Sequence, residues 1–487
     1  MNNFIKYNIQ IIKILIILFP ALLITGPFLP DLFSVYLSIF YLIFLIRKDK
    51  LHYYKNYFLV FFFFFYLYLN FNSFFISFNP EVSLQSSLPF LRIVTFIFAL
   101  SFFFKTYPNI KTYLFYLFIA CITCLFVDSF YQFFYDQNLF GYTLQSPERI
   151  TSFFGKEQIM GSYIARLLPF FLGLSFLLNL KNSNYINLFI IIISGLLIFL
   201  SSERLSAAFY IITLVAYFFI NFDKKILIIF FCFFFVTIFA LNIYKSDQLT
   251  RLYSSTVDQI FKNNHFIGTS YRHMLHYKTA YKIFLDKPTF GQGLKSFRYL
   301  CGDKKYSLQE EIFKDNTIVA TFDGTFSYQE FERNSKKFFI FGIIDKKNTF
   351  KKLGIRNVED NFYYSAFKDG DEVKAGETIV SHYEYNNGCN THPHNIMLQV
   401  LAELGLFGLL FFLAMYLYVV YHLILLFAQN IIKKVDKVSA CKFFILLGIF
   451  STMTPLFPSG NYFNNWLLLI TYFPIGFYLS LIKFESK

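Results

Sequence analysis

Residues Thr391-His392-Pro393-His394-Asn395 stand where a long polar segment meets a hydrophobic one, and they could handle protons. A histidine near its unperturbed pKa is suited to take a proton from an attacking hydroxyl at neutral pH. Proline disfavours helical geometry in the residue before it, so we expect a helix to begin at or just after Pro393. His394 and Asn395 would then occupy its first turn, where free N–H groups favour anions. The alternative is a histidine that only caps the helix or fills the loop.

Two arginines could bind an anionic substrate. Arg204 lies beside Glu203 in a hairpin between two apolar segments, and Arg272 precedes a Gly-x-Gly sequence at 291–293. A guanidinium fork matches phosphate oxygens, and a charge at membrane depth is costly unless it faces a cavity or a partner. Together the two arginines predict a pyrophosphate site. Two alternatives stay open: an interfacial Arg204 that reaches lipid phosphate, and an Arg272 on a solvated helix face.

The histidine block does not favour metal binding. No set of carboxylates or thiolates near His392 and His394 would complete a ligand shell. The sequence therefore predicts neither a metal site nor a cofactor.

The elements that position these residues are expected to lie in a membrane. Of 487 residues, 56% are hydrophobic and only 15% are charged, which excludes an ordinary soluble core. A bilayer-spanning helix needs roughly 17–25 apolar residues, and by that rule the chain has about twelve such segments. We therefore expect an all-α polytopic membrane protein with spans near 9–27, 31–46, 57–71, 88–104, 112–134, 159–180, 184–202, 204–221, 225–244, 396–428, 440–457 and 462–482.

The distribution of charge predicts the orientation of these spans. The net charge of +14 could indicate a nucleic-acid partner, but the basic residues gather in short loops that alternate along the chain. With the N-terminus inside, these loops fall on the cytoplasmic side, as the positive-inside rule requires. Both termini are then expected in the cytoplasm. The histidine block and Arg149, Glu203, Arg204 and Arg272 fall on the opposite side.

Three regions are expected along the chain. Residues 1–244 read as an N-terminal transmembrane bundle of about nine helices, and 396–487 as about three C-terminal transmembrane helices. Between them, 245–395 form a large loop outside the membrane. Its first part, 245–300, has a helical amphipathic pattern, whereas 301–390 is rich in strand-type runs separated by Asp-Gly turns and predicts a small β-rich insertion.

Two of the six cysteines bracket this insertion. Cys301 and Cys389 lie on the expected outer side, where oxidants allow disulfides. We predict that they pair and close the base of the insertion. The other four cysteines lie in or beside the apolar segments, where a free thiol behaves as a small hydrophobe.

The spacing of the histidine block resembles that of a known family. His394-Asn395, nine residues, then Gly405-x-x-Gly408 is similar to the signature of the bacterial O-antigen ligase family, which includes O-antigen polymerases and protein O-oligosaccharyltransferases. The resemblance covers roughly residues 145–470 in order. It extends to Ser202-Glu203-Arg204, to Arg272 followed by Pro288-x-x-Gly291-x-Gly293, to 458–466 and, more weakly, to 149–155.

The resemblance implies a metal-independent, inverting, membrane-embedded glycosyltransferase. Such an enzyme moves a glycan from polyprenyl (undecaprenyl) pyrophosphate to an acceptor on the periplasmic face of the bacterial inner membrane, and the ligases use lipid A-core as acceptor. Arg204 and Arg272 would bind the pyrophosphate, and His394 would act as base or orient the acceptor. Further predicted roles are substrate binding for Arg149, His392, Asn395 and Glu203, and close helix packing for Gly405 and Gly408.

Other functions remain open at this level. A polymerase or a protein glycosyltransferase would share the motifs and differ only in its acceptor. A transporter or flippase of lipid-linked sugars belongs to another class, in which interrupted helices and polar residues near the midplane recur in both halves. Here the polar residues concentrate on one side of the membrane. The expected partners are the lipid-linked donor, the acceptor and membrane lipids, and the sequence indicates no oligomeric state.

Overall fold

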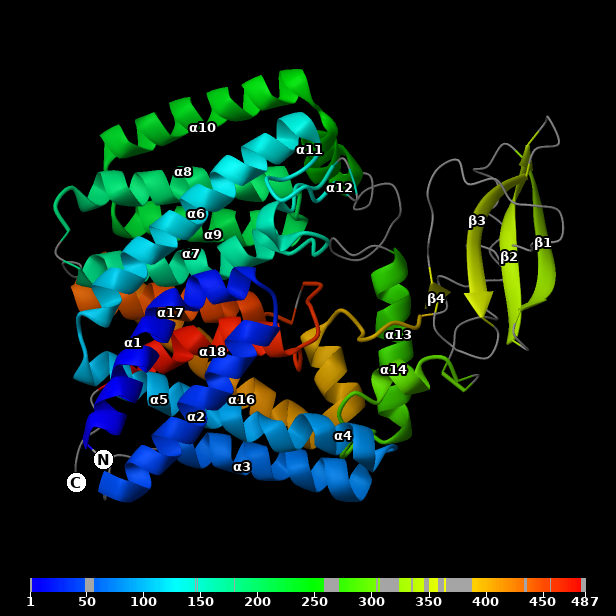
Figure 1. Ribbon diagram of the computed structural model, residues 1–487, viewed down its shortest axis with the longest axis horizontal. Helices are drawn as coiled ribbons and strands as arrows, with labels where there is room; N and C mark the ends of the chain where they lie inside the picture. The colour runs from blue at the N-terminus through cyan, green and yellow to red at the C-terminus, as the bar shows by residue number, and fades with distance from the viewer. Residues whose placement is uncertain are drawn as a thin grey trace.

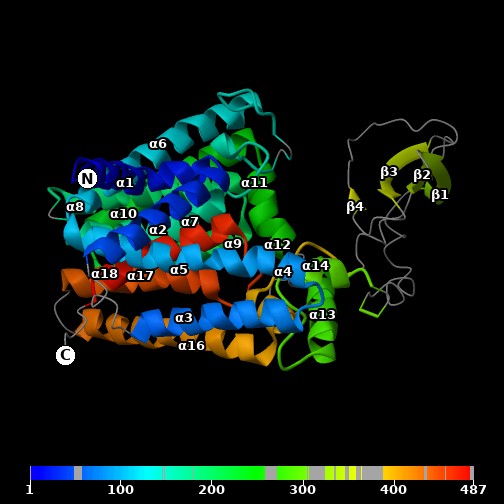
Figure 2. The ribbon, with the colours of Figure 1, turned by 60° about the horizontal axis from the view of Figure 1, so that its bottom comes forward.

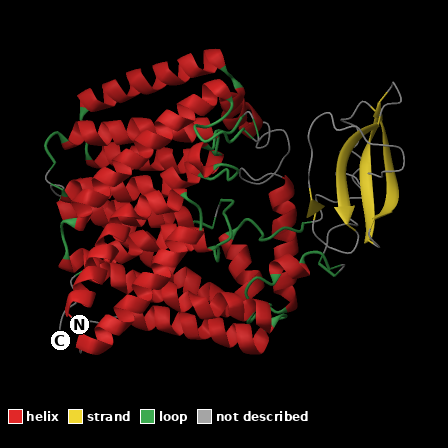
Figure 3. Ribbon diagram, in the orientation of Figure 1, coloured by secondary structure: helices red, strands yellow, loops and turns green. Residues whose placement is uncertain are grey.

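The computed structural model shows a bundle of long helices that lie side by side (Figure 1). It describes residues 2–48, 57–144, 146, 148–178, 180–257, 271–303, 305–306, 324–333, 336–345, 350–357, 363–364, 388–432, 436–455 and 457–482. Figure 3 distinguishes the helices from one group of strands.

A helix covers each segment that was expected to span the membrane. The bundle comprises α1 (Asn2–Ile24), α2 (Phe28–Lys48), α3 (Tyr57–Phe71), α5 (Leu91–Thr106), α6 (Ile110–Tyr135), α7 (Met160–Leu177), α8 (Ser183–Ser201), α9 (Arg204–Ile220), α10 (Lys224–Tyr244), α16 (Ile396–Ile432), α17 (Lys437–Met453) and α18 (Asn465–Ser480). The short α4 (Pro80–Ser87) and a 3-10 turn, Leu88–Phe90, run into α5.

Length and composition support a membrane location for this bundle. Among the described residues, eight helices are long and apolar enough to cross a bilayer, and Phe28–Phe44, Arg204–Ile220 and Asn465–Ser480 are shorter apolar helices. A helix satisfies its own backbone hydrogen bonds, which a lipid environment requires. The protein is therefore a polytopic helical membrane protein.

The N-terminal and C-terminal helices pack into one bundle. α17 packs along α7, where a Cβ on Gly173 would lie 2.9 Å from the Cys441 carbonyl oxygen. α18 packs along α5, and the Trp466 indole donates a hydrogen bond of 2.9 Å to the Leu23 carbonyl. The three C-terminal helices therefore complete the core that the first nine begin.

The two ends of the bundle differ in what they carry. Both chain termini lie at one end, together with the short connections that follow α5, α7 and α9 (Figures 1 and 2). The other end carries the hairpin between α8 and α9, the α6–α7 connection, α13 (Tyr271–Asp286) and α14 (Phe297–Leu300). Also at this end are α11 (Asp247–Leu249), a π-helical turn at Thr250–Ser254 and α12 (Ser255–Val257). α13 runs across the direction of the bundle helices rather than along it (Figure 1).

The segment after α13 contacts the bundle at a break in α16. Gly405 has φ 65° and ψ −163°, which interrupts the helix. Segment 287–293 docks at the break: the Gln292 and Gly293 amides donate to the Ala402 and Glu403 carbonyls at 3.0 and 2.8 Å. In return the Leu406 amide donates to the Pro288 carbonyl at 2.9 Å. The freed backbone groups of the broken helix are thus satisfied by the segment that follows α13.

The strands form one antiparallel sheet in the order β1-β2-β3-β4. They are β1 (Gly324–Arg333), β2 (Lys336–Asp345), β3 (Phe350–Asn357) and β4 (Tyr363–Tyr364), with a register shift at Phe341/Gly342. The sheet falls within 301–390, most of whose other residues lie outside the described part of the chain. A disulfide joins Cys301 to Cys389, with 4.8 Å between their Cα atoms, as their position in the sequence predicts.

Candidate functional site

The histidine block forms a capped turn ahead of α16. The helix begins at Ile396, and the Asn395 side chain accepts a hydrogen bond of 3.0 Å from the Leu398 amide. His394 has φ 55°, in the left-handed region, so it lies before the helix. The expectation that His394 and Asn395 occupy the first helical turn is therefore wrong. Asn395 takes the N-cap position because its short side chain can reach the N3 amide.

Four imidazoles meet at this turn. The ring centroid of His394 lies 4.1 Å from that of His392, 5.1 Å from His273 and 5.4 Å from His276. The last two belong to the first turns of α13, so the helix that crosses the end of the bundle brings them to the block. Asn390 lies 3.1 Å from Nε2 of His394 through its side-chain nitrogen.

Burial keeps the two block histidines neutral. Burial and, next, the three neighbouring imidazoles lower the pKa of His394 to about 2. Burial also lowers the pKa of His392 to about 4, with the Ser459 backbone opposing the shift and His276 adding to it. Their ring nitrogens therefore keep an unprotonated acceptor at any pH near neutrality.

The backbone around His394 is held from two sides. Its carbonyl oxygen accepts hydrogen bonds from the Ser459 amide at 2.8 Å and from the Tyr277 hydroxyl at 3.4 Å. The Asn395 side-chain amide donates to the Pro455 carbonyl at 2.8 Å. Both polar groups of the Asn395 side chain thus form hydrogen bonds within the protein, which hold the start of α16.

Residues 458–466 also help to hold the start of α16 in place. The Gln399 side chain donates to Asn461 at 2.8 Å and accepts from the Tyr462 amide at 3.0 Å. The Asn464 side chain caps α18 through the Trp466 and Leu467 amides. The resemblance at 458–466 therefore corresponds to a loop that fixes the start of α16.

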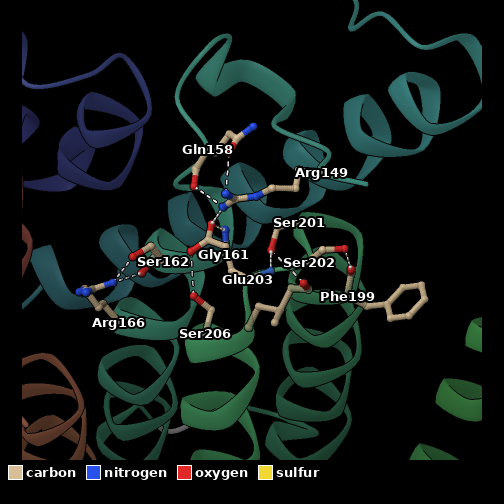
Figure 4. A network of polar contacts seen from close by, with 11 residues as sticks. Arg149, Gln158, Gly161, Ser162, Arg166, Phe199, Ser201, Ser202, Glu203 and Ser206 are labelled. Carbon is tan, nitrogen blue, oxygen red and sulfur yellow. Dashed lines mark hydrogen bonds and ion pairs between the residues drawn. The ribbon is translucent and has the colours of Figure 1, made fainter. Parts of the chain in front are cut away.

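A second polar centre surrounds Glu203 (Figure 4). Its carboxylate accepts hydrogen bonds from the Gly161 amide at 2.9 Å and the Ser206 hydroxyl at 3.0 Å. Arg149 lies 3.9 Å away and donates to the Gln158 side chain and backbone at 2.5 and 2.9 Å. Burial raises the pKa of Glu203, whereas Arg149 and the Ser206 hydroxyl oppose the shift.

The carboxylate of Glu203, predicted to bind substrate, contacts other parts of the protein. Only 13% of its side chain is exposed, and both carboxylate oxygens are occupied by α7 and α9. Gly161 permits this approach, since a Cβ there would lie 3.2 Å from the Glu203 side chain and 2.3 Å from the Ser201 hydroxyl. Glu203 therefore joins the ends of α7, α8 and α9.

Arg204 belongs to a cluster of arginines at the start of α9. Arg251 and Glu148 lie within electrostatic range of both Arg204 and Arg149. Arg251 itself forms an ion pair of 2.7 Å with Glu148. Arg251 is not predicted from the sequence, because its π-helical turn at Thr250–Ser254 contains no motif and its partner Glu148 is far away in the sequence. Three guanidiniums against two carboxylates leave this cluster suited to an anion.

Of the two arginines predicted to bind pyrophosphate, Arg204 and Arg272, the structure describes the side chain of Arg204 only. Arg272 belongs to the first turn of α13, but its side chain lies outside the described residues. Among the described residues, Arg298 of α14 is a cation that acts electrostatically on His392.

The two polar centres are connected through one loop. The Phe209 ring of α9 lies 6.1 Å from the Phe457 ring, and two residues later the Ser459 amide binds the His394 carbonyl. Both centres lie at the end of the bundle opposite the termini (Figure 1). Within the described residues, no group of three or more His, Cys, Asp and Glu side chains is arranged to hold a metal ion.

The predicted packing glycines also have separate roles. Gly405 forms the break in α16 and contacts segment 287–293, whereas a Cβ on Gly408 would meet Leu404 in its own helix at 2.2 Å. Gly405 therefore permits a loop, in place of a second helix, to approach α16.

The O-antigen ligase family (Wzy_C) has a model that matches residues 189–323. No curated protein sequence matches the chain. The matched range includes the hairpin of Glu203 and Arg204, the turn of Arg251, α13 and segment 287–293. Residues 189–323 are therefore similar to the O-antigen ligase family.

Proposed function

We propose that this protein transfers an O-antigen-like glycan from polyprenyl (undecaprenyl) pyrophosphate to lipid A-core during lipopolysaccharide biosynthesis. The family supports O-antigen ligase or polymerase chemistry in general. The observation that carries the finer proposal is the presence of neutral histidines and an arginine cluster at one end of the bundle. In the expected topology that end faces the periplasm of a bacterial inner membrane.

The arginine cluster would bind the leaving group. Pyrophosphate gains negative charge as its bond to the sugar breaks, and fixed guanidiniums stabilise that charge. Arg204 and Arg251 are suited to this role because Glu148 forms an ion pair with Arg251 and also acts electrostatically on Arg204. Arg149 donates hydrogen bonds to Gln158, so its role would be to position the cluster and not to bind the phosphates directly. Arg272 stays a candidate for a second contact with the phosphates.

His394 would act on the acceptor. The acceptor hydroxyl oxygen forms a bond to the anomeric carbon while the bond from that carbon to the pyrophosphate oxygen breaks, with inversion. The hydroxyl proton passes to His394, and the bonding electrons leave with the pyrophosphate. Burial makes His394 a weak base in the free protein, but an adjacent pyrophosphate anion favours the protonated imidazole and raises its pKa on donor binding.

A transfer reaction with purified protein tests the proposal. Polyprenyl-pyrophosphoryl glycan is supplied with and without lipid A-core, and products are separated by size and weighed. We expect glycan on lipid A-core and release of polyprenyl pyrophosphate. His394→Ala and Arg204→Lys should each lower the rate by about 10²-fold or more. Arg92→Lys serves as the control, since Arg92 forms an ion pair with Asp31 and is not among the groups that act electrostatically on Arg149 or Arg204.

The acceptor separates the related activities. Extension of one carrier-linked glycan by another identifies a polymerase, and glycan on a Ser, Thr or Tyr side chain identifies a protein O-oligosaccharyltransferase. A transporter or flippase would move the donor across vesicles and leave its glycan bond intact. Full activity of His394→Ala with normal folding would refute the proposed base.

A further inference from the structure

A polar cavity of about 460 Å³ opens at the end of the bundle that carries the termini. It lies between the end of α7, the start of α8, Asn221 after α9 and Lys437 at the start of α17. The histidine block and the arginine cluster belong to the opposite end. The cavity is therefore separate from the candidate transfer site.

Two ammonium groups and several amides line this cavity. Both lysines are exposed; Lys181 lies in the α7–α8 connection and Lys437 is the first residue of α17. The Asn221 side chain donates to Asn184 at 3.1 Å, which fixes these two amides at the wall. The N-termini of α8 and α17 add their partial positive charge. The wall is therefore suited to an anion.

Asn187 points to a ligand with a donor group. Asn187 is 3% exposed and lines the cavity, and although its side chain contacts the Tyr217 hydroxyl, its oxygen Oδ1 has no hydrogen-bond partner among the described residues. A buried acceptor without a donor is costly. A ligand hydroxyl in the cavity would satisfy it.

The position of the cavity in the bundle indicates where such a ligand comes from. The α7 span ends at Leu177 and the α8 span begins at Ser183, so the cavity lies at the boundary between hydrocarbon and water. Phe176, Leu178 and Leu180 form its apolar side. Anion-binding and apolar walls at this depth match the two parts of a lipid molecule.

We propose that this cavity binds the headgroup of phosphatidylglycerol. The lipid phosphate lies between Lys181 and Lys437, a glycerol hydroxyl donates to Oδ1 of Asn187, and an acyl chain packs against Phe176 and Leu178. The lipid bridges the α7–α8 connection and the start of α17, and the helices α7 and α17 themselves pack along each other.

Lipid retention by the purified full-length protein tests this site. The protein is exchanged into vesicle-derived nanodiscs that contain phosphatidylglycerol and phosphatidylcholine, extracted into mild detergent, and its bound lipids are counted by native mass spectrometry. We expect one retained phosphatidylglycerol. Each lysine near an anionic lipid changes the affinity about fivefold, so Lys181→Ala/Lys437→Ala should weaken retention about thirtyfold. Asn187→Leu should weaken it with both lysines present.

The matched control is Lys224→Ala/Lys225→Ala, which removes two exposed lysines from the same end of the bundle but outside the cavity. Retention unchanged in this control and lost in the cavity variant supports the site. Equal losses in both variants would show a diffuse surface effect and overturn it. Displacement of the lipid by inorganic phosphate alone, or equal retention of phosphatidylcholine, would overturn the assignment to this lipid. The readout is independent of glycan transfer, and Lys181→Ala alone provides a milder variant if the double variant unfolds.

Discussion

Gly291 and Gly405 meet backbone to backbone, so closely that a Cβ on Gly405 would lie 2.5 Å from the Gly291 nitrogen. The reverse contact is equally tight, because a Cβ on Gly291 would lie 2.6 Å from the Gly405 nitrogen. Both residues also have positive φ angles. Two glycines that the sequence separates by more than a hundred residues therefore fix one joint between α16 and the segment after α13.

Replacing either glycine should loosen this joint. Gly291→Ala and Gly405→Ala each force a methyl group into backbone, and we expect a loss of roughly 1–3 kcal/mol from this crowding, beyond the strain of the φ angle. Thermal unfolding in detergent measures it. Gly26→Ala is the matched control, since Gly26 has φ +100° with nothing within 4 Å of its added Cβ. Equal destabilisation by Gly26→Ala would show that the φ angle alone matters.

The histidine block should make stability depend on pH. The pKa values of His394 and His392 are lowered to about 2 and about 4, so below the ordinary histidine pKa the unfolded chain binds protons that the folded protein does not. Stability is then complete above about pH 6.5 and falls toward pH 4, by up to about 1.4 kcal/mol per pH unit for each histidine. The thermal midpoint is measured over this range. In His392→Asn the slope should be shallower, and an unchanged slope would contradict the assignment.

Replacing Glu203 should destabilise the protein much more than replacing Glu148, although both residues pair with arginines. Glu203→Ala removes a largely buried carboxylate and leaves the Gly161 amide and Arg149 without it, so we expect a loss of about 3 kcal/mol or more. Glu148→Ala breaks an ion pair whose glutamate side chain is 42% exposed and should cost about 1 kcal/mol or less. Similar thermal midpoints for the two variants would show that Glu203 is not the junction of α7 and α9.

The Cys301–Cys389 disulfide should stabilise the histidine block. It closes an 88-residue separation just before the block, and its removal in Cys301→Ser/Cys389→Ser should cost about 2–5 kcal/mol. Transfer activity should fall with it, because His394 follows Cys389 closely. Cys124→Ser is the control, as Cys124 is a free, exposed cysteine in α6. Intact mass under non-reducing conditions verifies the bond, and full activity of the double variant would separate the bond from the site.

The apolar runs predicted the positions of the bundle helices because a bilayer imposes a minimum length on every spanning element. The proline rule, in contrast, predicted His394 in the first turn of α16, whereas it lies just before the helix. The proline rule states only where a helix is disfavoured, whereas the start of α16 depends on which side chain reaches the N3 amide, and Asn395 does.

Other features depend on contacts between distant residues. Arg251 has no local motif, and only its ion pair with Glu148 brings it into the arginine cluster. His273 and His276 lie in an ordinary amphipathic pattern, and the crossing direction of α13 places them against His394. Gly405 looked like a helix-packing residue, because sequence spacing does not distinguish a close helix contact from a break.

At the break in α16, segment 287–293 provides the hydrogen bonds that the next helical turn would otherwise form. A surface loop ordinarily absorbs an inserted residue, but this segment supplies hydrogen bonds to Ala402 and Glu403 and receives one from Leu406. One added residue would shift every one of these bonds out of alignment. Connections between helices usually tolerate an inserted residue. We expect that segment 287–293 does not.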